Sequence, residues 1–269
     1  MILPSTVSAV RCIVWVMHQG QMSVQLYGHS GLRQVVAELQ CSLILASIQQ
    51  IEFRRPNTPM AEELNRDAAV AGDAGLSMLI ERFAQDSGHH ELRNAPILFW
   101  GFSAAAGFGT TFAALHPDRT IAFVRYHSHR RGSTTSVDRL KTTPALLVAG
   151  GRDQTAGTED ASELWRSGRA AGAPWTLAVE PEAQHSSPEI HEKTVTSLTV
   201  PWISAVVRLR LNDKRPLKSV PVGETWLADV STSETAAFAA FRGDRGAAVW
   251  LPDASSAKGW QAVTQPVSR

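Results

Sequence analysis

Short apolar stretches alternate with longer helical patterns along the first 210 residues. Six stretches rich in Val, Ile, Leu, Phe and Trp are bounded by Gly, Pro or polar residues, which is typical of buried strands. They cover residues 10–17, 42–48, 96–101, 121–127, 144–150 and 174–180. Helical patterns cover residues 31–39, 61–84, 104–115, 160–171 and 189–210. Because the strands are almost continuously apolar rather than alternating, we expect an α/β fold with a doubly wound, mostly parallel sheet covered on both faces.

The pattern changes near residue 211. A basic run, RLRLNDKRPLK (208–218), is followed by segments that contain Pro, Gly and Ser and that do not form a second hydrophobic core. Residues 247–260, AAVWLPDASSAKGW, predict a strand and then a helix capped by Asp253. We therefore expect a core in residues 1–210 and a C-terminal extension, 211–269, that packs on it.

The amino-acid composition and net charge indicate which class of partner the chain binds. The chain has 269 residues, 43% of them hydrophobic, and 26 basic residues against 25 acidic ones give a formal charge of +1. This balance does not attract nucleic acid or an anionic membrane, so a small molecule is the expected partner. No apolar run is long enough for a membrane span, and the chain as given begins without a secretory signal pattern, which fits a cytoplasmic protein or a secreted one whose leader is missing. The sequence does not determine the oligomeric state.

The two cysteines, Cys12 and Cys41, are too few for a disulfide framework and lack a CxxC spacing. The first interpretation is a pair of buried thiols. Each residue also lies at the start of a predicted strand, so a bridge would form if the two strands are parallel neighbours. Such a bridge would imply an oxidising compartment.

The third apolar stretch leads through a G-x-S-x-A pattern, Gly101 to Ala105, into a helical pattern. A sharp turn from strand to helix holds its central residue in a strained conformation and accepts only small residues two positions away. Ser103 is then exposed above the sheet edge, and the N–H of Ala104 faces developing negative charge. The alternative is a small residue in a tight turn. We predict that Ser103 is a nucleophile.

A serine nucleophile needs a base and an acid that orients the base. Asp153 follows the fifth predicted strand and His185 follows the sixth, so both lie at the same sheet edge as Ser103. The chain order Ser, Asp, His is the one expected of this fold. The alternatives are Glu159 or Asp160 as the acid and His191 as the base, or a capping role for Asp153 and a surface position for His185. His127 and His129 precede Asp153 and fit the order poorly.

Two further groups of residues are candidates for the site. The turn after the first strand, His18 to Gln21, offers a backbone N–H at Gly20 as a second oxyanion donor beside Ala104. The loop RYHSHRRG follows the fourth strand, and His129, Arg130 and Arg131 bring positive charge that binds an acidic substrate group, or else form a solvated loop. The Pro-interrupted segment 51–65 is a candidate cover for the pocket mouth.

Residues 10–210 resemble the α/β-hydrolase superfamily, in particular its serine esterase-like members. The matching segments are MHQG at the oxyanion turn, GFSAA at the elbow, ALHPDR after its helix, GGRD at the acid and AQHS at the base. The sequence departs from the family at Ala105, where glycine is commoner, and in lacking the leading antiparallel strands.

The resemblance implies hydrolysis of a small-molecule carboxylic ester by Ser103, His185 and Asp153 through an acyl-enzyme, with no cofactor or metal. Two alternatives stay open. One is a catalytically silent ligand-binding protein of the same fold, and the other is a serine peptidase.

Overall fold

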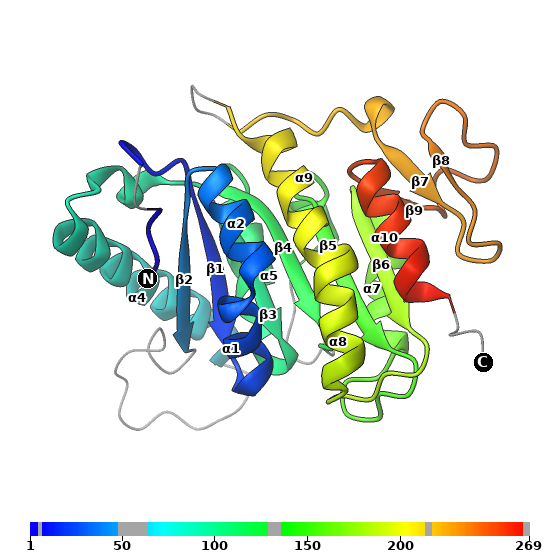
Figure 1. Cartoon of the computed structure of the whole chain (residues 1–269), viewed down its shortest axis with the longest axis horizontal. Helices are drawn as coiled ribbons and strands as arrows, with labels where there is room; N and C mark the ends of the chain where they lie inside the picture. The colour runs from blue at the N-terminus through cyan, green and yellow to red at the C-terminus, as the bar shows by residue number, and fades with distance from the viewer. Residues whose placement is uncertain (5–6, 48–63, 129–135, 213–216, 266–269) are drawn as a thin grey trace.

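The computed structural model describes residues 1–4, 7–47, 64–128, 136–212 and 217–265. Its centre is a six-stranded parallel sheet in the order β2-β1-β3-β4-β5-β6 (Figure 1). The strands are β1 (Cys12–His18), β2 (Cys41–Ser47), β3 (Ile97–Phe102), β4 (Thr120–Tyr126), β5 (Ala145–Gly150) and β6 (Trp175–Glu180). Each predicted strand is confirmed to within two residues at its ends. Buried side chains of all six form the core, as the near-continuous apolar patterns predicted.

Helices cover both faces of this sheet (Figure 1). One layer holds α1 (Gly20–Gly28), α2 (Ser30–Glu38), α8 (Pro188–Thr194), α9 (Val200–Arg210) and α10 (Ala254–Thr264). The other holds α4 (Leu64–Ser87), α5 (Ala106–Leu115), α6 (Val137–Leu140) and α7 (Glu159–Ala170). Short 3₁₀ helices at His90–Asn94, Ser103–Ala105 and Val222–Glu224 join the other elements. The doubly wound α/β prediction is confirmed.

The strand order reverses at β1. The chain goes from β1 to β2 on one side and then crosses to β3 on the other, and Met17 pairs with Gly101 in register. Ligands of such sheets bind at the carboxyl ends of the strands next to this reversal. The turns that follow β1 and β3 are therefore neighbours. The described strands of the sheet are all parallel, and ahead of β1 the described residues form an antiparallel bridge between Ile2 and Leu43.

The C-terminal segment contains a small antiparallel sheet as well as the predicted strand and helix. Its order is β8 (Thr235–Ala237), β7 (Trp226–Ala228) and β9 (Val249–Leu251). Asp253 accepts a hydrogen bond from the N–H of Ser256, so the predicted cap of α10 is confirmed. Trp260 donates to the carbonyl of Leu177 in β6, and Thr176 donates to the carbonyl of Trp250. These bonds join the segment to the edge of the main sheet.

Two predicted elements need correction. The expected turn at His18–Gln21 is shorter, because β1 continues to His18 and α1 begins at Gly20. The helix expected over 189–210 is divided into α8, a π-helical segment at Val195–Thr199, and α9. Pro201 has no N–H for the helical hydrogen bond at its position, and the wider π turns lie directly before α9.

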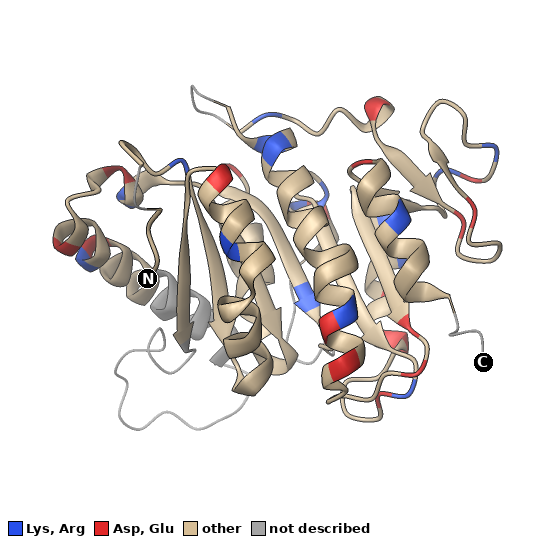
Figure 2. Ribbon diagram, in the orientation of Figure 1, with Lys and Arg blue, Asp and Glu red and all other residues tan. Residues whose placement is uncertain are grey.

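Basic and acidic residues are interspersed along the helices and loops of the ribbon in Figure 2. The structure thus matches the nearly balanced charge of the sequence. Among the described helices, none combines the length and the apolar content that a membrane crossing requires.

Cys12 and Cys41 form a disulfide bond, so the first interpretation as free thiols is wrong. The two residues begin β1 and β2 and are direct partners in the parallel register. Both side chains are buried. The bond closes a loop between residues that are 29 positions apart.

Replacing both cysteines, as in C12A/C41A, should lower the free energy of unfolding by about 3–4 kcal/mol, because the unfolded chain regains the entropy that the closed loop removes. Urea unfolding of the oxidised wild type and the double variant measures this difference. Under a reducing agent that opens the disulfide bond, the free energies of unfolding of the two proteins should become similar. Equal stability of both oxidised proteins would contradict the prediction.

Candidate active site

Ser103 occupies the turn between β3 and the helix formed by Ser103–Ala105 and α5. Its φ of 54° is in the left-handed region, which a non-glycine residue adopts at a cost of order 1–3 kcal/mol. The preceding Phe102 is still extended, and the following residues are helical. This abrupt change of direction brings the Ser103 hydroxyl to the carboxyl edge of the sheet.

The close approach of α5 to β3 requires glycine at position 101. A Cβ on Gly101 would lie 2.5 Å from Cα and 2.7 Å from N of Ala106, both backbone atoms. Gly109 is similar, since a Cβ there would lie 2.6 Å from Cβ of Phe99. The small residues around the serine therefore have a packing reason as well as a conformational one.

His185 lies between Ser103 and Asp153. Its Nε2 is 3.1 Å from Oγ of Ser103, and its Nδ1 is 2.8 Å from Oδ2 of Asp153. An ionised carboxylate only accepts, so Nδ1 carries the hydrogen and Nε2 accepts from the serine hydroxyl. The ring of Phe102 covers His185 at a centroid distance of 5.0 Å. The structure thus brings together the three residues that the sequence analysis selected.

Asp153 accepts hydrogen bonds at both carboxylate oxygens. Oδ1 accepts from the N–H groups of Thr155 and Ala156 at 2.8 and 2.9 Å, and Oδ2 accepts from His185 and from Nδ1 of His127. Burial raises the pKa of the Asp153 carboxyl, but the N–H of Ala156, the His185 ring and the N–H of Thr155 outweigh burial and hold that pKa below its ordinary value. Asp153 is a buried, ionised acceptor.

The candidate oxyanion donors lie on neighbouring turns. Ala104 follows Ser103 at the start of a helix, where the first N–H groups have no carbonyl of the same helix to bond. Gly20 opens α1 directly after β1, the strand that pairs with β3. In the same turn, the N–H of Gln19 donates to Ser23, which in turn donates to the carbonyl of Met17.

The other candidate residues are either outside the described part of the chain or have different partners. His129, Arg130 and Arg131, together with segment 51–63, fall outside the described residues. The alternative acid Glu159 lies on α7 and pairs with Arg166, and Asp160 lies on the same helix. The alternative base His191 is buried on α8 and contacts Glu180 instead of Ser103.

The sequence analysis missed a buried network behind Asp153. His127, at the end of β4, lies between two carboxylates: its Nδ1 is 2.9 Å from Oδ2 of Asp153 and its Nε2 is 2.7 Å from Oε2 of Glu180. All three side chains are fully buried. The available signal was a Glu at the end of an otherwise apolar strand and a His at a strand end on the same edge. The Ser, Asp, His chain order directed attention away from His127.

Two further side chains bind Glu180. Tyr126 donates its hydroxyl to Oε1 at 2.6 Å, and Nδ1 of His191 lies 3.1 Å from Oε2. The N–H of Ser187 donates to Nε2 of His191, so the His191 hydrogen is on Nδ1 and points at Glu180. Burial raises the pKa of Glu180, but hydrogen bonds from His127 and His191 outweigh it and lower that pKa to about 2. Burial and Glu180 hold the pKa of Tyr126 well above its ordinary value, so Tyr126 stays a donor.

Two groups of these side chains have metal-ligating atoms within 4.8 Å of one another. One group is His127, Asp153 and His185, and the other is His127, Glu180 and His191. The atoms that could bind a metal are the same ones that form the hydrogen bonds described above. We interpret both groups as parts of one hydrogen-bond network.

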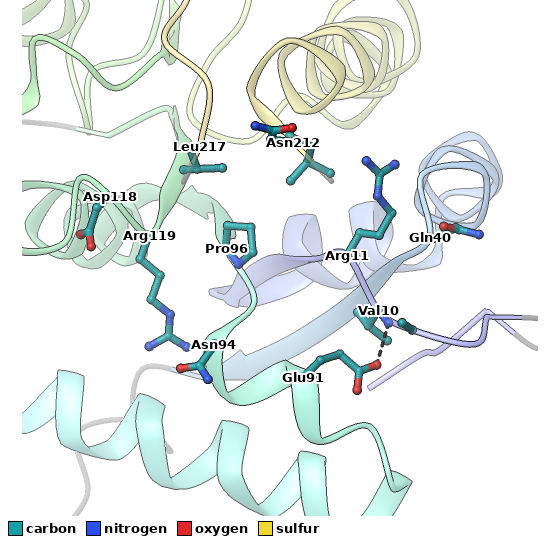
Figure 3. Close-up of a pocket in the computed structure, with 12 residues that line it drawn as sticks. Val10, Arg11, Gln40, Glu91, Asn94, Pro96, Asp118, Arg119, Asn212 and Leu217 are labelled. Atoms are coloured by element: carbon teal, nitrogen blue, oxygen red, sulfur yellow. Dashed lines mark hydrogen bonds between the residues drawn. The ribbon is translucent and has the colours of Figure 1, made fainter. Parts of the chain in front are cut away.

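Two cavities differ in their relation to Ser103. A hollow of about 800 Å³ lies beside Asp153 and His185 and is lined mainly by polar residues of the loops after β5 and β6. A cavity of about 760 Å³ lies near the amino-terminal ends of the strands, lined in part by Val10, Pro96 and Arg119 (Figure 3). Because Val10 and Pro96 precede β1 and β3, this second cavity is at the opposite edge of the sheet from Ser103.

Neither protein-family models nor curated proteins match this chain. Solved structures do. Est1E from Butyrivibrio proteoclasticus superimposes with a TM-score of 0.53 at 11% identity, over 77% of this chain and 92% of that chain. The chain has the α/β-hydrolase fold. The Bacillus cereus carboxylesterase gives a TM-score of 0.49 at 17% identity, over 77% of this chain and 92% of that chain. The carboxylesterase from Mesorhizobium loti gives 0.49 at 16% identity, over 72% and 88%.

In this α/β-hydrolase fold, Gly101→Ala should separate the elbow from β3. The added Cβ meets the backbone of Ala106, so we expect a loss of about 1–3 kcal/mol in the free energy of unfolding and a loss of any activity that depends on Ser103. Gly107→Ala in the same helix is the matched control, because its Cβ meets nothing within 4 Å. Urea unfolding compares the two, and equal stabilities would contradict this account.

Glu180 makes folding sensitive to acid. The pKa of Glu180 is about 2 in the folded protein against an ordinary 4.5. Ionised Glu180 therefore stabilises the folded state fully above about pH 4.5, and this stabilisation is lost as the pH falls toward 2. The shift corresponds to about 3 kcal/mol. Glu180→Gln should therefore reduce the acid dependence of the free energy of unfolding, measured with urea from neutral pH to about pH 3. Glu163→Gln, on the exposed surface of α7, serves as control and should keep the wild-type dependence.

Proposed function

We propose that this chain is a serine hydrolase that cleaves a carboxylic ester of a small molecule. The observation that carries the proposal is the pair of contacts made by His185, 3.1 Å to the hydroxyl of Ser103 and 2.8 Å to the carboxylate of Asp153. A hydroxyl becomes a nucleophile when a base takes its proton and an acid orients that base. Two further features support the assignment of a hydrolase: the α/β-hydrolase fold, and the position of Ser103 after β3, next to the reversal of strand order at β1.

In the proposed reaction, Nε2 of His185 takes the proton of Ser103 as Oγ attacks the ester carbonyl. Asp153 stabilises the imidazolium that forms. The tetrahedral intermediate then breaks its bond to the alkoxide, which takes the proton of the imidazolium and leaves as an alcohol, and the acyl group stays on Ser103. Water, deprotonated by the same nitrogen, attacks the acyl group, releases the acid and restores Ser103. The Ser103 hydroxyl and water supply every proton that moves, and His185 carries each one.

The oxyanion of each tetrahedral intermediate needs donors near Ser103. We assign this role to the N–H of Ala104 and to the turn at Gly20, which the pairing of β1 with β3 brings beside the elbow. Such donors are worth about 10²–10³ in kcat. His129, Arg130 and Arg131 remain candidates for binding an acidic group of the substrate.

A fluorophosphonate, which reacts with activated serines, tests the proposal. We expect one label on the peptide that contains Ser103, no label in Ser103→Ala and a labelling rate at least about 100-fold lower in His185→Ala, because the hydroxyl then loses its base. Ser167→Ala, an exposed serine on α7, should label as the wild type does. Mass spectrometry locates the adduct.

Hydrolysis of p-nitrophenyl esters and of the matching p-nitroanilides then defines the reaction. Ester cleavage that depends on Ser103 supports the esterase, whereas faster cleavage of the anilide would point to a peptidase. A folded wild type that neither labels nor cleaves would refute the proposal and favour a ligand-binding protein of the same fold.

A further inference from the structure

We propose that His127 is a positioning residue of the Ser103 site, which, as an imidazolium held between Asp153 and Glu180, fixes the Asp153 carboxylate and limits the negative charge facing His185. This inference rests on the proposed function. It adds a second histidine and a second carboxylate, buried behind Asp153, to the three residues of the proposed reaction.

Hydrogen-bond geometry determines the protonation of His127. Each ring nitrogen lies within 3 Å of a carboxylate oxygen, Nδ1 near Asp153 and Nε2 near Glu180. A carboxylate without its proton offers no hydrogen, so both nitrogens of His127 must donate. Burial removes water as an alternative partner, because the three side chains have no exposed surface. The ring therefore carries a positive charge.

Glu180 is bonded as an ionised carboxylate. It accepts from Tyr126 at one oxygen and from His191 and His127 at the other. The low pKa of Glu180, about 2, agrees with this bonding. A carboxylate so placed keeps His127 oriented, and His127 in turn holds Oδ2 of Asp153, the oxygen that also accepts from His185.

The backbone supports the same arrangement. His127 has a φ of 47°, in the left-handed region, and this turns its ring from the end of β4 toward β5 and β6. A Cβ on Gly150 would lie 2.6 Å from Cε1 of His127, so glycine there leaves room for the ring. A strained residue that is also buried and charged is typical of a site with a functional constraint.

The charges around His185 follow from this network. The titratable groups that face His127 are Asp153, Glu180, His185, His191 and Tyr126. Two carboxylates and one imidazolium carry the net charge of a single carboxylate. The buried Arg125 of the same strand donates to Thr110 and Ser128. Removal of the His127 charge alone would leave His185, at a ring distance of 6.1 Å, facing two carboxylates.

The test uses a charge-balanced pair of variants. His127→Asn suits a left-handed residue, keeps a donor for Asp153 and removes the donor to Glu180. We expect the acid limb of the kcat/KM profile for p-nitrophenyl acetate to move up by about one pH unit, because the added negative charge stabilises protonated His185. In the double variant H127N/E180Q the second carboxylate is gone, so the acid limb should return close to that of the wild type.

A matched control comes from the opposite edge of the sheet. His89 forms a similar contact with a carboxylate, 2.8 Å from Oε1 of Glu91, and His89→Asn should leave the acid limb unchanged. A merely structural role of His127 would lower activity at every pH without moving the limb. An unmoved limb in H127N, or no return in the double variant, overturns the proposal.

A second measurement needs no variant. In wild-type protein with ¹⁵N-labelled histidine, both ring nitrogens of His127 should give protonated, slowly exchanging signals at neutral pH. A signal from one unprotonated nitrogen of His127 would overturn the proposal even if H127N fails to fold or is too slow to assay. Failure of the proposed function can be distinguished from failure of this inference, because the wild type would then neither cleave the ester nor react with the fluorophosphonate.

Discussion

The structure of the site depends on the hydrogen bonds that converge on the carboxylate of Asp153. Two backbone N–H groups bind one oxygen and two imidazoles bind the other. These bonds join the ends of three neighbouring strands, since His127 follows β4, Asp153 follows β5 and His185 follows β6. A buried charge persists only when its partners are complete, so the loops at this edge are constrained by the same requirement that orients His185.

Close approach of backbone is the second constraint on the site. Gly101 lets α5 pack against β3, and Gly150 leaves room for His127 and for the loop that carries Asp153. A side chain at Gly101 would meet the backbone of α5, and one at Gly150 would meet the carbonyl of Ala183 and the ring of His127. The sharp turn at Ser103 and the dense network behind Asp153 therefore depend on small residues as much as on polar ones.

The strand-by-strand pattern was sufficient to predict the sheet, because buried parallel strands read as continuous apolar runs. The positions of Ser103, Asp153 and His185 after the third, fifth and sixth strands also predicted that they would meet at one edge. Glu180 and His127 were missed for a physical reason: their partners come from neighbouring strands through the register of the sheet, which a linear pattern does not contain. The disulfide between Cys12 and Cys41 likewise depended on strand order, and β7 and β8, with three residues each, were too short for an apolar pattern.

The residues of the site differ in how much they contribute to the stability of the fold. The Ser103 hydroxyl contacts only His185 among the hydrogen bonds described, so its removal leaves no buried charge without a partner. Removal of His127 or Glu180 takes one partner from a buried charge that remains, which is costly for folding. The same bonds thus stabilise the loops after β4, β5 and β6 and orient His185, whereas the position of Ser103, directly after β3, is set mainly by the backbone geometry of its turn.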